Sequence, residues 1–190
     1  MLLRMPLVAA LGLTLALPPA EAAETSFRLD PGATEIGFTL GATLHTVDGT
    51  FRMEEGIVRF DRETGALGGR IVVDARSGET GNRRRDRKMH AQVLDSTDYP
   101  SIVFVPEKLT GEVPVSGHAT VTVHGTLTLL GAGHPLDLRV EIDVHDRLVE
   151  ATTRFRVPYV AWGLKDPSVF VLRVDKYVDV TVRGQGRLEG

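Results

Sequence analysis

The chain has 190 residues, a formal net charge of −3 and no cysteine. This length suits one domain, and the near balance of charges gives no electrostatic reason to expect nucleic acid or an anionic membrane surface as a partner. The lack of cysteine excludes thiolate catalysis, cysteine metal sites, disulfides and a lipid anchor on an N-terminal cysteine.

The first 22 residues have the pattern of a secretory signal peptide. Arg4 supplies the positive start, residues 7–17 form an apolar run, and Ala20-Glu21-Ala22 is an A-x-A cleavage pattern. Such a run covers about 16 Å as a helix, roughly half of a bilayer core, and the other interpretation is a buried N-terminal helix. We predict cleavage after Ala22 or Ala23, a domain over residues 23–190, a periplasmic location and no stable membrane anchor.

From Ser26 onward, apolar and polar residues alternate with period two, which predicts strands that bury one face. Turns are expected at residues 30–32 and 61–65, and Asp48-Gly49 has the composition of a hairpin turn. The alternating apolar positions of this half are Phe27, Leu29, Ile36, Phe38, Leu40, Phe51, Met53, Val58, Phe60, Ile71 and Val73.

Residues 81–94 interrupt the alternation. Asn82 is a suitable N-cap, and residues 83–90 are good helix formers without glycine or proline. One short helix is therefore predicted here. Tyr99-Pro100 ends any helix, because the residue before a proline is forced into extended geometry, and residues 102–104 resume the strand pattern.

The second half of the chain returns to alternation at residues 119–129, 136–144 and 178–182, with loops expected at 131–135 and 159–163. Antiparallel strands with one apolar face must close on that face, as a sandwich or a barrel. We predict an all-β protein, an extended antiparallel lipocalin-like β-barrel of about eight strands with one short helix. Such a barrel is wide enough inside to hold one small ligand.

Motifs of catalysis are missing from the sequence. It has no G-x-S-x-G elbow, no Walker loop and no H-E-x-x-H pattern. His118 and His124 share a strand face opposite Val121 and Val123, so both are expected to face solvent rather than converge on a metal ion. We predict no catalytic residue, no metal site and no cofactor, and hence not an enzyme.

The densest positive charge of the chain lies in the predicted helix, at Arg83, Arg84, Arg85, Arg87 and Lys88. One interpretation is a solvated helix face. The other is a recognition patch for an anionic head group such as a prenyl diphosphate, because a guanidinium group presents a fork of donors to phosphate. Both interpretations stay open at this point.

A set of short motifs runs through the chain: Asp74-Ala75, Thr80-Gly81-Asn82, Arg85-Asp86, Tyr99-Pro100 before Ile102-Val103-Phe104, and residues 121–125 with Pro135-Leu136 downstream. Together they resemble the YceI-like family of exported lipocalin-like proteins. The resemblance implies a long, narrow antiparallel barrel around an apolar tunnel. It also implies binding of polyisoprenoid chains or other amphiphilic lipids, and the family includes homodimers.

We therefore predict a carrier that holds an amphiphilic lipid, expected to be an isoprenoid, inside the barrel. The residues expected at the ligand are Phe38, Leu40, Phe104, Leu127 and Trp162 along the tunnel, and Arg84, Arg87 and His90 near a polar head. Two alternatives stay open. A filled barrel would suit a stress-related structural or interaction protein, and polar groups inside the tunnel would suit an enzyme acting on a quinone-like lipid.

Overall fold

The structure, a computed structural model, describes residues 25–43, 45–61, 63–168 and 173–189. The predicted signal peptide lies outside these residues. The described strands are β1 (Thr25–Leu29), β2 (Glu35–Leu40), β3 (Val47–Phe60), β4 (Leu67–Glu79), β5 (Ser101–Thr110), β6 (Gly117–Leu129), β7 (Ala132–His145), β8 (Leu148–Val157) and β9 (Val178–Glu189).

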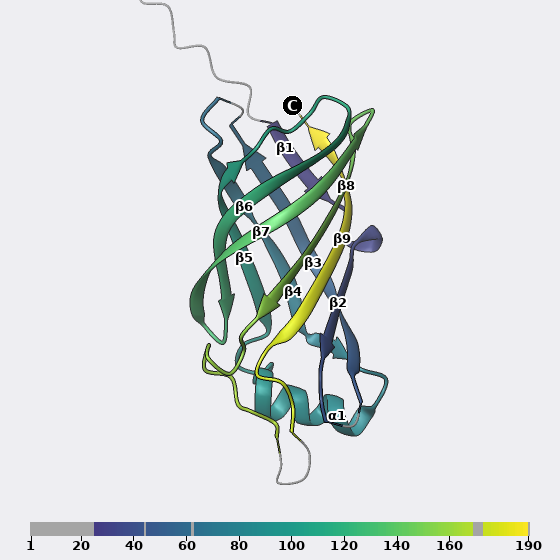
Figure 1. Cartoon of the computed structure of the whole chain (residues 1–190), viewed down its shortest axis with the longest axis vertical. Helices are drawn as coiled ribbons and strands as arrows, with labels where there is room; N and C mark the ends of the chain where they lie inside the picture. Colours follow the sequence, from purple (N-terminus) through teal and green to yellow (C-terminus); the bar gives the residue numbers. More distant parts are fainter. Residues whose placement is uncertain (1–24, 44, 62, 169–172, 190) are drawn as a thin grey trace, which may run out of the picture.

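The strands close into one antiparallel barrel (Figure 1). Neighbours pair in the order β9, β8, β7, β6, β5, β4, β3, and β1 and β2 both bridge β3 and β9. In β1, Phe27 lies opposite Val58 and Leu188, whereas β2 pairs with other parts of the same two strands. Because β1 and β2 share one position in the wall, the barrel has eight positions in all. The predicted fold class is confirmed.

A short 3-10 turn, η1 (Pro31–Ala33), separates β1 from β2. The Asp30 carboxylate caps this turn and accepts a hydrogen bond from the backbone N–H of Gly32 at 2.8 Å. Pro31 stands at the start of the turn, where the backbone N–H that it lacks would have no helical partner. The turn predicted at residues 30–32 is confirmed. After this turn, β2 pairs with a different part of the same two strands, β3 and β9, that β1 pairs with.

A helical segment crosses one end of the barrel (Figure 1). We call this the helix end, and the opposite end, where the C-terminus lies, the terminus end. The segment consists of α1 (Arg83–Lys88) and a π-helical continuation, η2 (Met89–Leu94), so it runs four residues beyond the prediction. The side chain of Asn82 accepts from the backbone N–H groups of Arg84 and Arg85, which confirms the predicted N-cap. No helix in the described part of the chain is long and apolar enough to cross a bilayer.

Two predicted turns were wrong. Asp48-Gly49 lies inside β3, where Gly49 is paired with Phe38 and leaves room for its ring. Residues 131–135, expected as a loop, belong mostly to β7. The chain already reverses at Leu130 and Gly131, whose φ angles of 50° and 73° fit a two-residue hairpin turn.

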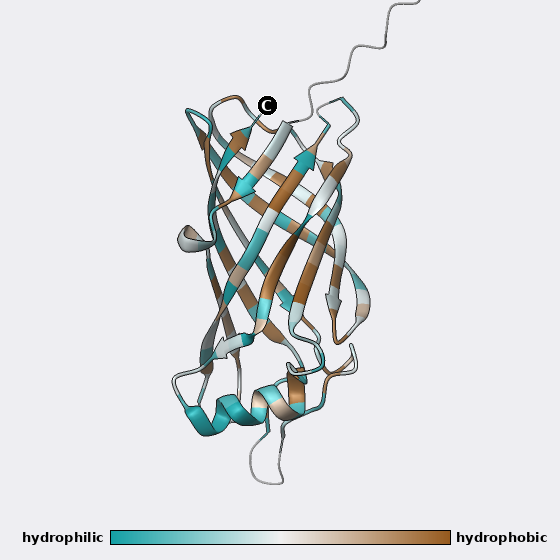
Figure 2. Cartoon of the chain, turned by 180° about the vertical axis from the view of Figure 1, so that it is seen from behind, coloured by the Kyte–Doolittle hydropathy of each residue, from teal (hydrophilic) through white to brown (hydrophobic). Residues whose placement is uncertain are grey.

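The inside of the barrel differs between its two ends. Brown and teal alternate along the strands in Figure 2, as expected when every second side chain points inward. Toward the terminus end, Val121, Ile142, Val144 and Val149 form a buried cluster, in which Val144 is 0% exposed. Toward the helix end, the inward-facing side chains surround a cavity.

Candidate ligand-binding site

A cavity of about 680 Å³ occupies the helix-end part of the barrel. This size falls in the range of small-molecule sites, about 300–1,000 Å³. All nine described strands contribute to its wall, since each has apolar residues on its inner face. The apolar wall includes Ile36, Phe38, Leu40, Phe51, Ile71, Ile102, Phe104, Leu127, Leu129, Leu138, Phe155, Val157, Val178 and Val180.

The cavity has one blind end. Leu29, Ile36 and Met53 pack together there and are each less than 9% exposed. Beyond them lies the buried cluster around Val144. The resemblance implied a tunnel, whereas the described residues enclose a pocket that is filled toward the terminus end and extends to the helical segment at the helix end.

Aromatic rings of the wall lie against glycines of the adjacent strand. A Cβ atom at Gly49 would stand 2.3 Å from Cζ of Phe38, and one at Gly125 would stand 2.7 Å from Cζ of Phe104. Only a glycine allows such an approach. The rings can therefore lie along the wall, which leaves the centre of the barrel open.

Three hydroxyl groups of the wall have hydrogen-bond partners on the backbone. The hydroxyl of Thr153 donates to the backbone carbonyl of Arg139 at 2.9 Å, and that of Thr34 to the carbonyl of Asp30 at 2.8 Å. The Tyr159 hydroxyl donates to the carbonyl of Asp175 at 2.7 Å. Burial, followed by nearby carboxylates, raises the pKa of Tyr159 to about 12. Because these hydroxyl groups donate to backbone carbonyls, the surface that the wall presents to a ligand is mainly apolar.

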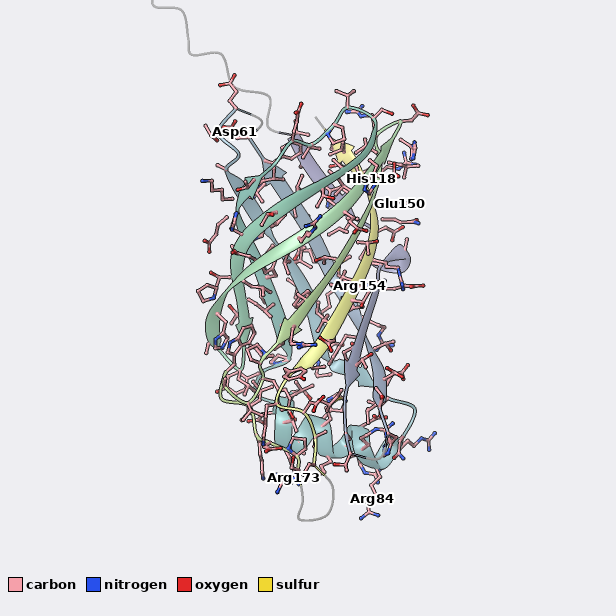
Figure 3. All side chains as sticks on the ribbon, in the orientation of Figure 1. Asp61, Arg84, His118, Glu150, Arg154 and Arg173 are labelled. Atoms are coloured by element: carbon pink, nitrogen blue, oxygen red, sulfur yellow. The ribbon has the colours of Figure 1, made fainter. Side chains whose placement is uncertain are left out.

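Charged residues gather where the cavity meets the helix end. Arg84, Arg85 and Lys88 line this mouth, and Arg84 is seen at the helix end in Figure 3. Arg85 is held in place, since its Nε donates to Oγ1 of Thr80 at 2.7 Å and its Nη2 to the Thr80 carbonyl at 2.9 Å. The Asp86 carboxylate in turn accepts from the backbone N–H of Thr80 at 3.0 Å. The mouth is therefore basic and partly rigid.

The structure places five of the eight predicted ligand residues on the cavity wall: Phe38, Leu40, Phe104, Leu127 and Arg84. The other three, Arg87, His90 and Trp162, lie outside the lining. Their part in binding stays a prediction, as does that of the first five.

The three residues outside the lining have other surroundings. Arg87 is exposed on α1. The His90 ring lies between Oγ of Ser96, 3.0 Å from Nδ1, and the carbonyl of Gly78, 2.9 Å from Nε2. A carbonyl only accepts, so Nε2 carries the proton. The Trp162 ring stacks on His134 with 4.2 Å between ring centroids and 2° between planes.

Sequence reasoning missed the inward side of the helical segment. Lys88, Met89, Val93 and Leu94 all line the cavity. Lys88 follows Arg84 by four residues, and Val93 follows Met89 by four, which is the spacing of one helix face. That signal was present, but the predicted helix stops at His90 and its apolar side is too short to recognise.

The histidines of β6 lie apart from the cavity. His118 is exposed, and the ring of His124 lies 2.7 Å from the Asp137 carboxylate and 3.0 Å from the Thr110 hydroxyl on the outer surface. Within the described residues, no three His, Cys, Asp or Glu side chains gather closely enough to hold a metal ion.

The chain matches a known family along most of its length. The model of the YceI-like domain matches residues 27–185. No curated protein matches the chain.

Solved structures share the fold at low sequence identity. BcnA of Burkholderia cenocepacia has a TM-score of 0.67 and 16% identity, over 85% of this chain and 99% of that one. A polyisoprenoid binding domain of Saccharophagus degradans, implicated in plant cell wall breakdown, has a TM-score of 0.66 and 14% identity, over 86% and 98%. A mutant YCEI protein of Campylobacter jejuni has a TM-score of 0.61 and 14% identity, over 78% and 88%.

Proposed function

The chain belongs to the YceI-like family, and we propose that it is a periplasmic carrier of a single-chain amphiphilic lipid of the isoprenoid class. The apolar tail would occupy the cavity, and the polar head would stay at the helix end. The periplasmic location is supported by the leader pattern of the first 22 residues.

The observation that carries this proposal is the cavity itself, about 680 Å³ of mainly hydrocarbon-lined space inside the barrel. Burying one isoprene unit contributes about 3–4 kcal/mol at about 0.8 kcal/mol per carbon, before the cost of association. A few units are then enough for micromolar affinity. The polyisoprenoid binding domain of Saccharophagus degradans, which has the same fold, supports the ligand class.

Native mass spectrometry of the protein purified from its own periplasm, followed by organic extraction, tests the proposal. The expected result is a bound mass that the extract identifies as a lipid. A bare protein mass, together with no uptake of added geranylgeraniol, would overturn the carrier proposal. It would favour the alternative of an interaction protein that binds partners through the outer surface of its barrel.

A pair of variants links binding to the cavity. Leu138 is 8% exposed and lines the cavity, so Leu138→Trp should fill the space and abolish uptake. Leu148 is 48% exposed at the terminus end, so Leu148→Trp makes the same change outside the cavity and should bind as the natural protein does. Equal uptake by both variants would contradict binding in the cavity.

A further inference from the structure

The basic mouth of the cavity points to the head group. We propose that the ligand carries a phosphate or diphosphate head and that Arg84 and Lys88 bind it. This rests on the proposed function, because it assumes that a tail occupies the cavity. It adds the chemical class of the head and the direction in which the ligand enters.

The charged side chains that line the cavity are all positive. Among the described residues they are Arg84, Arg85 and Lys88, with no aspartate or glutamate. The chain as a whole carries a net charge of −3, so the basic mouth runs against its overall charge. A cleft lined by one sign of charge concentrates ions of the opposite sign.

Arg84 and Lys88 stand one helical turn apart in α1. Like charges at this spacing destabilise a helix by a few tenths of a kcal/mol. No ion pair joins either residue to a carboxylate of the described chain. Two acidic side chains of neighbouring segments have other partners: Asp86 accepts from Thr80, and Asp166 is paired with Lys176. An anion bound between Arg84 and Lys88 would remove their repulsion.

Arg85 is hydrogen-bonded within the protein and has a structural role. Its hydrogen bonds to Thr80, the residue after β4, hold α1 against this strand end and fix the face on which Arg84 and Lys88 stand. Arg85 is therefore a positioning residue. This division leaves one guanidinium and one ammonium group for the ligand, a pair suited to phosphate oxygens.

The distribution of apolar and charged residues along the cavity determines which end of the ligand enters first. The blind end is formed by Leu29, Ile36 and Met53, and the charged groups among the described lining residues stand at the helical segment. A phosphate at the blind end would lose its hydration without a partner, which is strongly unfavourable. The tail must enter first and the head must remain between α1 and the solvent.

Binding measured by titration of geranylgeranyl diphosphate and geranylgeraniol tests the proposal. The natural protein should bind the diphosphate at least about tenfold more tightly, as expected for charge-assisted hydrogen bonds. In the double variant Arg84→Gln, Lys88→Gln this preference should vanish while the alcohol binds as before. Both residues are exposed, so the variant should fold, and circular dichroism checks it.

A matched control removes two charges outside the lining. Arg83 belongs to α1 and Arg154 to the outer face of β8, and Arg83→Gln with Arg154→Gln should keep the full preference. Loss of the preference in this control as well would show a general charge effect and overturn the specific site. Geranylgeranic acid separates a phosphate site from one for any anion: affinity equal to that of the diphosphate would overturn the phosphate assignment.

The outcomes distinguish the two proposals. Equal binding of alcohol and diphosphate by the natural protein would overturn the head-group site and leave the carrier intact. Failure of both ligands to bind would overturn the carrier and the head-group site together. Competition by inorganic pyrophosphate alone, at millimolar concentration, should weaken binding of the diphosphate and leave that of the alcohol unchanged.

Discussion

The ring of Phe51 in β3 lies against Gly78 in β4. A Cβ atom at Gly78 would stand 2.5 Å from Cε1 of Phe51 and 2.9 Å from the terminal methyl carbon of Met89. Both contacts are with side chains, and both side chains line the cavity. Gly78 therefore sets how far two wall residues project into the open centre of the barrel.

Gly78→Ala should narrow the cavity. The new methyl group must push Phe51 and Met89 inward, and Phe51 already lies 5.3 Å from Phe38 between ring centroids. We expect a stability loss of about 1–3 kcal/mol from overpacking and weaker binding of the longest prenyl alcohols. Urea unfolding and ligand titration measure the two effects.

Gly37→Ala is the matched control for this substitution. Gly37 lies in β2, and a Cβ atom there would be 3.9 Å from the nearest atom, an ordinary contact. Its stability should stay within about 0.5 kcal/mol of the natural protein and its affinity should not change. If Gly78→Ala behaves like Gly37→Ala, the close approach of Phe51 does not control the cavity.

The volume of the cavity predicts a limit on tail length. With about 30 Å³ for each heavy atom, the volume that one water takes in the liquid, 680 Å³ holds roughly 20 heavy atoms or four isoprene units. Affinity for prenyl alcohols should rise with each unit up to this length and then level off. Titration with a series of increasing length measures it, and a steady rise far beyond four units would contradict the blind end at Met53.

Met53→Ala should shift this limit to longer tails. Met53 is 6% exposed and stands at the blind end, so its truncation lengthens the cavity. The change should lower stability by about 2–5 kcal/mol, as large-to-small core substitutions do. The same alcohol series, measured under conditions where the variant is folded, should level off at a longer chain, and an unchanged plateau would count against the prediction.

Tyr159 should make the protein sensitive to alkaline pH. Its pKa is raised to about 12 in the folded state, above the usual value of about 10, chiefly by burial. Between these two values the unfolded chain loses the proton that the folded chain keeps, so the free energy of unfolding falls as pH rises from 10 to 12. In Tyr159→Phe this part of the fall should disappear.

Tyr159→Phe should also lower the free energy of unfolding by about 1 kcal/mol at neutral pH, because the hydrogen bond to the Asp175 carbonyl is lost. Urea unfolding at pH 7, 10 and 11 checks both statements. Parallel curves for the two proteins above pH 10 would show that Tyr159 is not the group responsible.

His90 should hold the helical segment to the barrel. It belongs to η2 and bonds to Gly78 in β4 and to Ser96, which is 4% exposed. His90→Ala leaves these groups without a partner and should destabilise by about 1–3 kcal/mol. Hydrogen exchange should speed up in residues 83–94 first. Faster exchange spread evenly over the strands, or none, would contradict this role.

Much of the wall could be predicted from the sequence, because period-two alternation marks Phe38, Leu40, Phe104 and Leu127 as inward-facing whatever their partners. The N-cap at Asn82 was also predictable, since it depends on residues next to it in the chain. Trp162 had no such signal: it lies in a loop, where no periodicity fixes the direction of a side chain, and it stacks on His134 of β7.

The sequence by itself determined most of the strands, the need to close on their apolar face and the position of the basic helix, because these follow from backbone periodicity and local capping. The tertiary structure alone decided which part of the barrel is hollow. That depends on contacts between strands, such as Phe51 with Gly78 and Phe104 with Gly125, and on the packing around Val144. Alternation points a side chain inward, but whether it fills the centre or lies along the wall is set by the neighbour across the strand pair.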